Sequence, residues 1–202
     1  MILMSDVKAF NRWDVSDITV SDKGIEPYIG LQPRIVAKTG ATYAGNRFHK
    51  SKIFIVERLI NKLMVAGHKG KKHLISSGHN TGKAQKVYDA VEEALSIVEE
   101  KLKVNPVAAF VKALENAAPR EEVVAIEYGG ARYPKAVECA PQRRIDVALR
   151  YMTQGASQKA FNSKRDLSST LADEIINAYN LSPQSAAVSK KNELERQADS
   201  AR

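Results

Sequence analysis

The chain has 202 residues, of which 44% are hydrophobic, and its 31 Lys and Arg against 23 Asp and Glu give a net charge of +8. This is enough apolar material to bury a core in one domain with tails. One cysteine, Cys139, excludes an internal disulfide framework and suits a reducing cytosol. Residues 1–6 lack the basic region and long apolar run of a signal peptide, and no stretch approaches a membrane span. We therefore expect a cytoplasmic protein.

Residues 1–45 show no sustained hydrophobic period, and we expect them to form an N-terminal extension. Asp, Ser, Gly and Pro are spread through the segment, which we expect to become ordered only against a partner. Trp13 is the only tryptophan of the chain. Its ring could stack on a nucleic-acid base, but packing against the domain is the more common role of tryptophan and is favoured here.

Helical periodicity begins at Ser51 and predicts three helices before Pro119. The first carries an apolar stripe and should stop at Gly67. A basic, glycine-rich loop over 67–82 separates it from a second helix, whose apolar stripe spans 87–102. Asn105 and the proline after it form a cap and a first-turn residue for the third helix. The second helix also has an acidic face, expected to point away from a polyanion, made of Glu92, Glu93, Glu99 and Glu100.

The period then changes from 3.6 to 2, which predicts a β-hairpin at about residues 122–140. Val124, Ile126 and Tyr128 alternate before the Gly129-Gly130 turn, and the chain returns through 133–139. Because Pro134 cannot donate a backbone hydrogen bond, the hairpin should be exposed along at least one edge. Tyr128 and Tyr133 suit base contacts and cross-strand packing equally well.

Two further helices and a charged tail complete the predicted fold. A fourth helix opens at Pro141 and should end at Gly155, and a fifth spans 167–178. Ser182 and Pro183 again form a cap and first-turn pair, so residues 182–202 are predicted to be a C-terminal helix or tail. The sum is a mainly α fold: a bundle of five to six helices, residues 46–181, with an inserted, protruding β-hairpin and an N-terminal extension.

The positive charge gathers in two blocks, which is typical of a protein that binds a polyanion. Between Gly45 and Lys83 nine basic residues face a single acid, Glu57, and the same segment holds all four histidines. A second basic block runs from Pro141 to Arg165, with Asp146 as its only acid. An anionic membrane is disfavoured as the partner, because no segment sets a basic face opposite a broad apolar face.

Signals for nucleotide, metal or catalytic chemistry are weak. The run 78–83 resembles a phosphate-binding loop, but it is one residue short and Ala84 replaces the hydroxyl that would bind magnesium. The four histidines lack metal-ligand spacing, so we expect no metal and no cofactor. A Ser/His/Asp set can only be recognised in the fold, yet the acids cluster at solvated spacing. We therefore expect a binding protein and not an enzyme.

Recognition of folded RNA through its shape and backbone fits the composition best. Motifs for sequence-specific reading of single strands are absent from the sequence. The alternative is a DNA-binding helical protein, since the fourth helix presents Arg143, Val147, Arg150 and Gln154 at helical spacing on its predicted outer surface. Competition between structured RNA and duplex DNA distinguishes these two hypotheses.

Several motifs, in order along nearly the whole chain, resemble the small-subunit ribosomal protein seven family. They are the runs Ile55–Met64, Gly70-Lys71-Lys72, Pro119-Arg120-Glu121, the Gly-Gly hairpin, Pro141–Arg144, Leu171–Glu174 and Lys190–Arg196. The extension around Arg12-Trp13-Asp14 resembles the archaeal and eukaryotic branch, and we take the chain to be archaeal.

The resemblance implies a helical domain with a protruding hairpin that binds the 3′ major domain of small-subunit ribosomal RNA. It also implies a role in starting assembly of the subunit head, a position near the exit site for transfer RNA and messenger RNA, and small-subunit protein eleven as a neighbour. The residues it implies for ribosomal RNA are Arg47, His49, Lys50, Lys52, Lys69, Lys71, Lys72, Lys83, Arg143, Arg144, Arg150, Lys164 and Arg165. Those it implies for the exit site are Gly130, Arg132, Tyr133 and Lys135.

Overall fold

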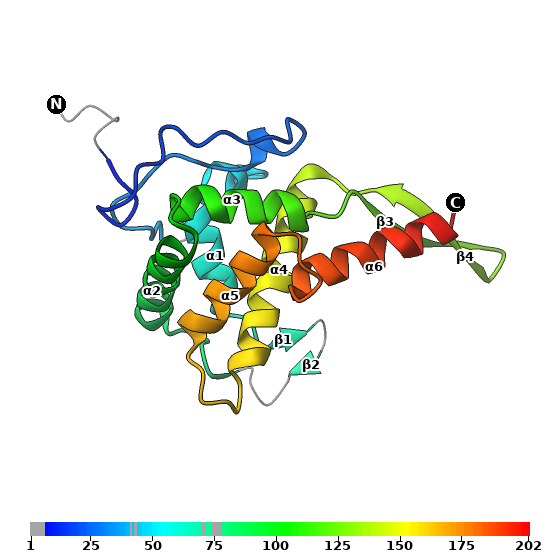
Figure 1. The fold of residues 1–202 in the computed structure, drawn as a ribbon. Helices are drawn as coiled ribbons and strands as arrows, with labels where there is room; N and C mark the ends of the chain where they lie inside the picture. The colour runs from blue at the N-terminus through cyan, green and yellow to red at the C-terminus, as the bar shows by residue number, and fades with distance from the viewer. Residues whose placement is uncertain (1–6, 41, 43, 70–71, 74–77) are drawn as a thin grey trace.

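A computed structural model describes residues 7–40, 42, 44–69, 72–73 and 78–202. Within these ranges the chain forms six α-helices and a long hairpin (Figure 1), which confirms the mainly α fold. The helices are α1 (Ile55–Leu63), α2 (Ala84–Leu102), α3 (Pro106–Ala117), α4 (Pro141–Ala160), α5 (Leu167–Tyr179) and α6 (Ala186–Ser200). The remaining elements are two short 3₁₀ turns, η2 (Glu26–Tyr28) and η3 (His49–Lys52), the short strands β1 (His68–Lys69) and β2 (Lys72–His73), and the hairpin strands β3 (Glu121–Tyr128) and β4 (Ala131–Glu138).

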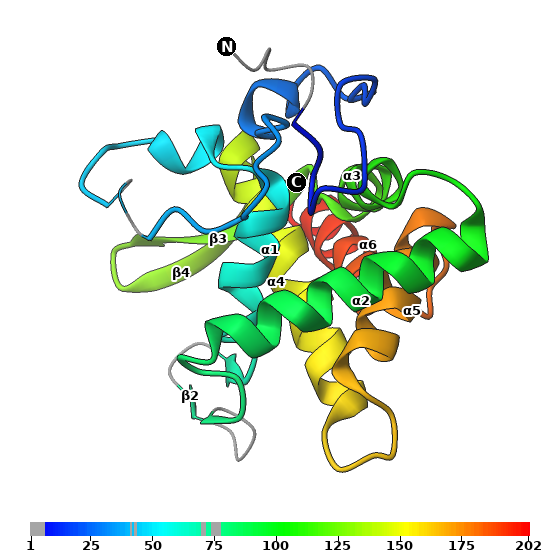
Figure 2. The same cartoon turned by 90° about the vertical axis from the view of Figure 1, so that its left-hand side faces the viewer.

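Helices α4 and α5 form the centre of the bundle, and the other helices pack around them (Figures 1 and 2). The apolar stripes predicted from periodicity face this centre: Leu149 and Met152 of α4, and Leu171 and Ile175 of α5, are at most 1% exposed. Burial of each such side chain stabilises the fold by roughly 1.5–3 kcal/mol. The sequence therefore predicted the core well, because periodicity and burial have the same cause.

Four predicted helix boundaries were wrong, and tertiary contacts explain three of the differences. Helix α1 begins at Ile55, because the chain before it runs extended and Ile55 donates a 2.9 Å backbone hydrogen bond to Gly30. It ends at Leu63, four residues before the predicted stop. Helix α4 passes through Gly155 and ends at Ala160, since Gly155 is where α6 packs closely. Helix α6 begins at Ala186.

The start of α6 is fixed by Ser185, not by the predicted Ser182-Pro183 pair. The Ser185 hydroxyl accepts a hydrogen bond from the backbone of Val188, and it donates one of 2.7 Å to the buried carboxylate of Glu174. Lys159 pairs with the same carboxylate at 2.9 Å. Glu174 of α5 therefore binds both α4, through Lys159, and the first turn of α6, through Ser185. Because Ser185 is held by this contact, it is the serine that caps α6.

The described part of the N-terminal extension packs on the bundle. Trp13 is 5% exposed, and its indole donates a 3.0 Å hydrogen bond to Glu99 of α2. Phe10 lies against both Trp13 and Tyr88, with ring centroids 5.7 and 4.9 Å away. The preference for packing at Trp13 was therefore right, and part of the acidic face of α2 binds the extension.

The hairpin extends from the body, and α6 supports its base (Figure 1). Strands β3 and β4 pair in one register, with Val124 opposite Lys135 and Ile126 opposite Tyr133. Gly129 and Gly130 have φ values of 59° and 81°, as a two-residue turn of this kind requires. Arg202 at the end of the chain pairs with Glu121 at 2.7 Å, so the C-terminus holds the first residue of β3. Across the described ranges, none of the helices combines the length and the apolar character needed to cross a bilayer.

Candidate nucleic-acid interface

A group of cations surrounds Asp146 where α1, α4 and η3 meet. Lys50 pairs with one carboxylate oxygen of Asp146 at 2.6 Å, and Arg58 pairs with the other at 3.1 Å. Arg58 is 3% exposed and also donates to the carbonyl of Tyr28, so its role is to hold the elements together. Lys62 and Arg150 are close enough to act on each other electrostatically. We call Lys50, Lys62 and Arg150 the central cationic cluster.

The electrostatics of this cluster show an excess of positive charge. Burial, together with the charges of Arg150 and Lys50, holds the pKa of Lys62 below its ordinary value despite the attraction of Asp146. Burial acts to raise the pKa of Asp146, but its hydrogen bonds and charge interactions with Lys50 and Arg58 outweigh burial and lower it. The carboxylate of Asp146 therefore balances only part of the positive charge around it. A bound phosphate would reduce the repulsion among the cations that remain.

The η3 segment extends the cationic surface beyond the central cluster. Arg47 and Lys52 are exposed, while His49 is half-buried. The Arg47 guanidinium lies over the ring of Phe48 at 5.0 Å, and that ring is 57% exposed. An exposed arginine–aromatic pair offers both a phosphate donor and a flat surface on which a base can stack.

Strands β1 and β2 place the basic loop after α1 at one end of the bundle (Figure 2). His68 pairs with His73 and Lys69 with Lys72 through the backbone. Gln154 of α4 donates a 3.2 Å hydrogen bond to the carbonyl of His68, which ties this loop to the face that carries Arg150. Of the residues expected to bind RNA here, Lys71 lies outside the described residues.

A second group of cations lines a hollow at the same end, between the start of α2 and the α4–α5 connection. The hollow has a volume of about 550 Å³, and Lys83, Lys86 and Arg165 line it. Lys83 donates a 2.6 Å hydrogen bond to the carbonyl of His79, and the His79 ring meets Phe161 edge-on at 5.5 Å. No side chain caps α2, so its first backbone N–H groups add to a site suited to a phosphate. We call this the α2-end hollow.

Lys164 and Arg165 lie on the α4–α5 connection beside this hollow. Lys164 is exposed, and Arg165 is held by an ion pair with Asp173 of α5. Lys101 of α2 shares the same carboxylate at 2.8 Å. The fold thus brings Lys83 and Arg165, which are 82 positions apart in the sequence, to one hollow.

Arg143 and Arg144, which the resemblance implies for binding ribosomal RNA, are both engaged in contacts within the chain. Arg143 makes a bidentate pair with Glu122 of β3, with both distances 2.6 Å, and its side chain is 52% exposed. Arg144 is 12% exposed and binds Asp22 of the extension at 2.8 Å and the carbonyl of Pro119 at 3.1 Å. Arg143 keeps an exposed edge, whereas Arg144 joins the extension to α4.

The expected exit-site residues lie on the exposed end of the hairpin. Tyr133 is 58% exposed and shares a face with Lys135, while Arg132 lies on the other face and makes a loose 3.6 Å pair with Glu127. Tyr128 is 81% exposed, so neither tyrosine is buried by cross-strand packing. Gly130 forms the tip. This arrangement leaves aromatic and cationic side chains free to contact another molecule.

Among the described residues, two features bear on metal binding and on nucleophilic chemistry. Across the parts of the chain that the structure describes, no three His, Cys, Asp or Glu side chains gather into a set that could hold a metal ion. Burial raises the pKa of the Cys139 thiol to about 11, with the charge of Glu122 adding to the effect, so the thiol is a poor nucleophile at neutral pH.

Two cations of the interface were not proposed as ligands from the sequence. Lys62 belongs to the basic block over 45–83 without being among the residues that the resemblance implies, and Lys86 lies just beyond that block. Both could have been found from helical spacing: Lys86 lies three residues after Lys83 and so shares its side of the helix, and Lys62 lies on the polar side of α1.

Taken together, a helical bundle with a cationic surface, a hollow suited to phosphate and an exposed aromatic hairpin define a protein built to bind a large folded polyanion. Residues 31–202 match the family described as Ribosomal protein S7p/S5e. The chain is 50% identical to the small ribosomal subunit protein uS7 of Nanoarchaeum equitans (strain Kin4-M) over 196 residues, which cover 97% of this chain and 99% of that protein.

Other archaeal relatives match as fully. The small ribosomal subunit protein uS7 of Methanothrix thermoacetophila is 46% identical over 97% of this chain and 100% of its own length. That of Archaeoglobus fulgidus is 46% identical over 98% of this chain and 96% of its own length. The chain belongs to the ribosomal protein S7p/S5e family and to its archaeal branch. It is a structural ribosomal protein and not an enzyme.

Proposed function

We propose that the chain is a structural constituent of the small ribosomal subunit in the cytoplasm and acts in translation by binding the 3′ major domain of small-subunit ribosomal RNA. Its relatives carry the name of a small-subunit protein. In this proposal the chain helps to start assembly of the subunit head, with small-subunit protein eleven as a neighbour. Its hairpin approaches the exit site, where it contacts transfer RNA and messenger RNA.

The observation that carries the proposal is the gathering of cations from several elements. They lie at η3, in the central cationic cluster next to the β1–β2 loop, and at the α2-end hollow. The acidic side chain of Glu99 is instead occupied by Trp13 and Arg12 of the extension. One side of the molecule therefore attracts phosphate over several elements, as recognition of folded RNA requires.

The alternative, a DNA-binding protein that inserts α4 into a major groove, is less well supported. A recognition helix must protrude from its domain so that side chains reach base edges. Helix α4 instead packs against α1, α3, α5 and α6. Val147, expected on its outer surface, is only 5% exposed, because it lies inside these contacts.

The hairpin's exposed residues support a contact at the exit site. Its tip lies away from the bundle (Figure 1), and one face presents Ile126, Tyr128 and Tyr133 together with Lys135. Aromatic rings stack on unpaired bases, and lysine offers a charge to a phosphate. An exposed hairpin of this kind suits a partner that passes along the surface of the protein.

The test is binding of the purified protein to a transcript of the 3′ major domain over a series of salt concentrations, with duplex DNA as competitor. Tight binding that survives excess DNA and falls steeply with salt is the expected result. The double variant Lys83→Ala/Lys86→Ala should reduce the salt slope by roughly 1–2, about one unit for each lost phosphate contact.

Lys103→Ala is the matched control for this double variant. Lys103 is exposed at the other end of α2, about 30 Å from Lys83 by helix geometry, and its loss should leave the slope unchanged. Equal affinity for RNA and duplex DNA would contradict the proposal. An unchanged slope in the Lys83/Lys86 variant would remove the α2-end hollow from the interface.

A further inference from the structure

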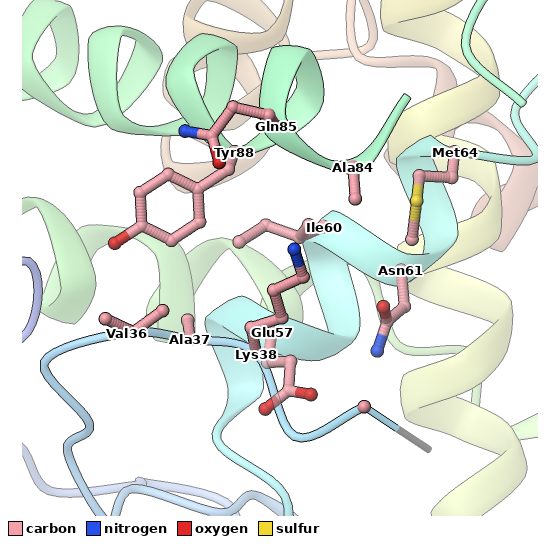
Figure 3. A pocket seen from close by; sticks show the side chains of 11 residues that line it. Val36, Ala37, Lys38, Glu57, Ile60, Asn61, Met64, Ala84, Gln85 and Tyr88 are labelled. Carbon is pink, nitrogen blue, oxygen red and sulfur yellow. The ribbon is translucent and has the colours of Figure 1, made fainter. Parts of the chain in front are cut away.

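A pocket separate from the cationic surface lies between the extension, α1 and α2 (Figure 3). Its volume is about 440 Å³, within the usual range for a site that binds a side chain or small ligand. Ile60 of α1 and Met64, which follows α1, line it, with Val36 of the extension and Tyr88 of α2 on the other side. Val36 and its neighbour Ile35 are 59% and 57% exposed, so the rim is apolar and open. We call this the Glu57 pocket.

Glu57 supplies a carboxylate with one unused oxygen to this pocket. The residue is 2% exposed. Its Oε1 atom accepts a 2.8 Å hydrogen bond from the backbone of Thr39 and another from the Thr39 hydroxyl. Its Oε2 atom is buried and, within the described part of the chain, has no hydrogen-bond partner. A buried carboxylate oxygen without a partner is costly, so this atom is well placed to accept a donor from outside the chain.

The charges around the pocket favour a cationic donor. Lys38 is the cation that lines it, and its side chain runs across the opening (Figure 3), but no ion pair joins it to Glu57. Asp89 and Glu92 lie near Tyr88: burial raises the pKa of the Tyr88 hydroxyl, and both carboxylates raise it further. Three acids, Glu57, Asp89 and Glu92, therefore lie in or near the pocket, in contrast to the cationic surface.

We propose that the Glu57 pocket binds the side chain of a lysine or arginine from another protein, with an apolar residue of the same segment resting on Ile35 and Val36. The cation donates to the free oxygen of Glu57, and its methylene stem packs against Ile60, Met64 and Tyr88. This goes beyond the proposed function, because it assigns a protein partner of stated chemistry to a surface that RNA does not require.

A protein segment fits this pocket better than RNA. Phosphates near the opening would meet the negative charges of Asp89 and Glu92 as well as that of Glu57. A neutral base could donate a hydrogen bond to Oε2, but it would leave the buried negative charge without a counter-ion. A guanidinium or ammonium group satisfies both needs at once.

The first test measures binding of two small probes to the full-length protein by NMR of its methyl groups. The probes are n-butylguanidinium and n-butylurea, which are matched in shape but differ in charge. We expect saturable shifts at Ile60 and Met64 with n-butylguanidinium, at roughly millimolar affinity for so small a ligand, and much weaker shifts with the urea. Equal binding of both probes, or no saturable shift with n-butylguanidinium, would overturn the proposal.

Variants then identify the carboxylate. Glu57→Gln should weaken n-butylguanidinium binding by about tenfold, because it removes a charge-assisted hydrogen bond. Glu100→Gln, an exposed acid near the far end of α2, is the matched control and should change nothing. Undiminished binding to Glu57→Gln would overturn the proposal. The wild-type comparison of the two probes still tests the pocket if that variant folds poorly.

Two further measurements test the other possible occupants of the pocket, which are a nucleic-acid base and the side chain of Lys38. If guanosine or cytidine shifts the same methyl groups at lower concentration than n-butylguanidinium, the pocket reads a base and the proposal fails. A double-mutant cycle between Lys38→Met and Glu57→Gln measures their coupling in thermal unfolding. Strong coupling would make Lys38 the partner of Glu57 and would also overturn the proposal.

A photo-crosslinker placed at Val36 tests the assembled small subunit, and this arm alone rests on the proposed function. We expect a cross-linked peptide of another protein that contains a lysine or arginine next to the cross-linked residue. The yield should fall when Glu57→Gln is added. A cross-link to RNA would contradict the protein partner without affecting the proposed binding of ribosomal RNA elsewhere.

Discussion

At the scale of single residues, charged side chains have two roles that the sequence does not distinguish. Arg58 is 3% exposed and binds Asp146, whereas Lys62, four positions later, reaches the central cationic cluster. Arg143 and Arg144 are neighbours, yet one lies at the surface and the other joins the extension to α4. Only contacts with other elements decide whether a cation holds the fold together or is free to bind RNA.

Asp146 should contribute stability that depends on pH. Its pKa in the folded state lies below the ordinary value of 3.8. Its contribution is therefore fully present above pH 3.8 and is lost as the pH falls further, through the lowered pKa of the folded state. Asp146→Asn should lower the free energy of unfolding at pH 7 by about 2–3 kcal/mol, because Arg58 loses its carboxylate partner in a buried site.

Urea unfolding of both proteins between neutral and acid pH checks this prediction. The difference between wild type and Asp146→Asn should shrink as the pH falls from 3.8 toward the lower pKa of the folded state, where the wild-type side chain becomes neutral in the folded protein as well. Asp199→Asn, which removes a carboxylate that is 69% exposed, should have almost no effect. A difference that stays constant with pH would show that Asp146 acts through packing or hydrogen bonds alone.

At the scale of elements, close contacts between helices override local sequence signals. Gly155 lies inside α4, although glycine usually ends helices, because a Cβ atom there would lie 2.6 Å from the Cβ atom of Ala186 in α6. The missing side chain lets α6 approach the bundle and reach Glu174. The same glycine that suggested a helix end is therefore the point where two helices pack together.

Gly155→Ala should lower the free energy of unfolding by roughly 1–3 kcal/mol through overpacking. Gly78→Ala is the matched control, since a Cβ atom there meets nothing within 4 Å, and its effect should be near zero or slightly stabilising. Thermal unfolding followed by circular dichroism measures both. Equal melting temperatures for the two variants would contradict the prediction, because they would show that α6 can shift to accommodate the added methyl group with little loss of stability.

Deletion of residues 129–132 should leave the bundle folded. A Cβ atom added at Gly129 or Gly130 would meet nothing within 4 Å, and Tyr128 and Arg132 are exposed. The free energy of unfolding should change by no more than about 1 kcal/mol. Calorimetry provides the measurement, and a large cooperative loss of stability would mean that the hairpin tip contributes to the core. Affinity for the 3′ major domain should stay the same, whereas contacts at the exit site should weaken.

At the scale of the whole molecule, the extension and the bundle form one packed unit. Trp13 attaches the extension to α2, and Asn105 donates a 2.6 Å hydrogen bond to the carbonyl of Asp14. Farther along, Asp22 binds Arg144 of α4. These contacts lie on three different helices of the bundle, so separation of the extension would expose apolar surface along much of its length.

Trp13, as the only tryptophan, reports whether the extension unfolds together with the bundle. We expect its fluorescence and the helical circular dichroism signal to change in one coincident transition. Arg144→Ala should lower the free energy of unfolding by about 1–3 kcal/mol and should shift the midpoints of both signals together. Arg143→Ala should change both midpoints little. A fluorescence transition that precedes the loss of helix would show that the extension separates first.

The sequence by itself determined the elements and the partner class of this protein. Periodicity identified the helices and the hairpin, because the side of an element that faces the core must be apolar. The clustering of charge identified a polyanion as partner, because net charge acts over distances longer than a contact.

The tertiary structure alone decided the helix ends, the order of the extension and the roles of individual cations. Gly155, Ser185 and Arg144 take their roles from residues far away in the sequence, namely Ala186, Glu174 and Asp22. The Glu57 pocket likewise needs Thr39, Ile60 and Tyr88 brought together. The hydrophobic periodicity of a segment indicates which side of a helix or strand is buried. It carries no information about which side chain of another element packs against that side.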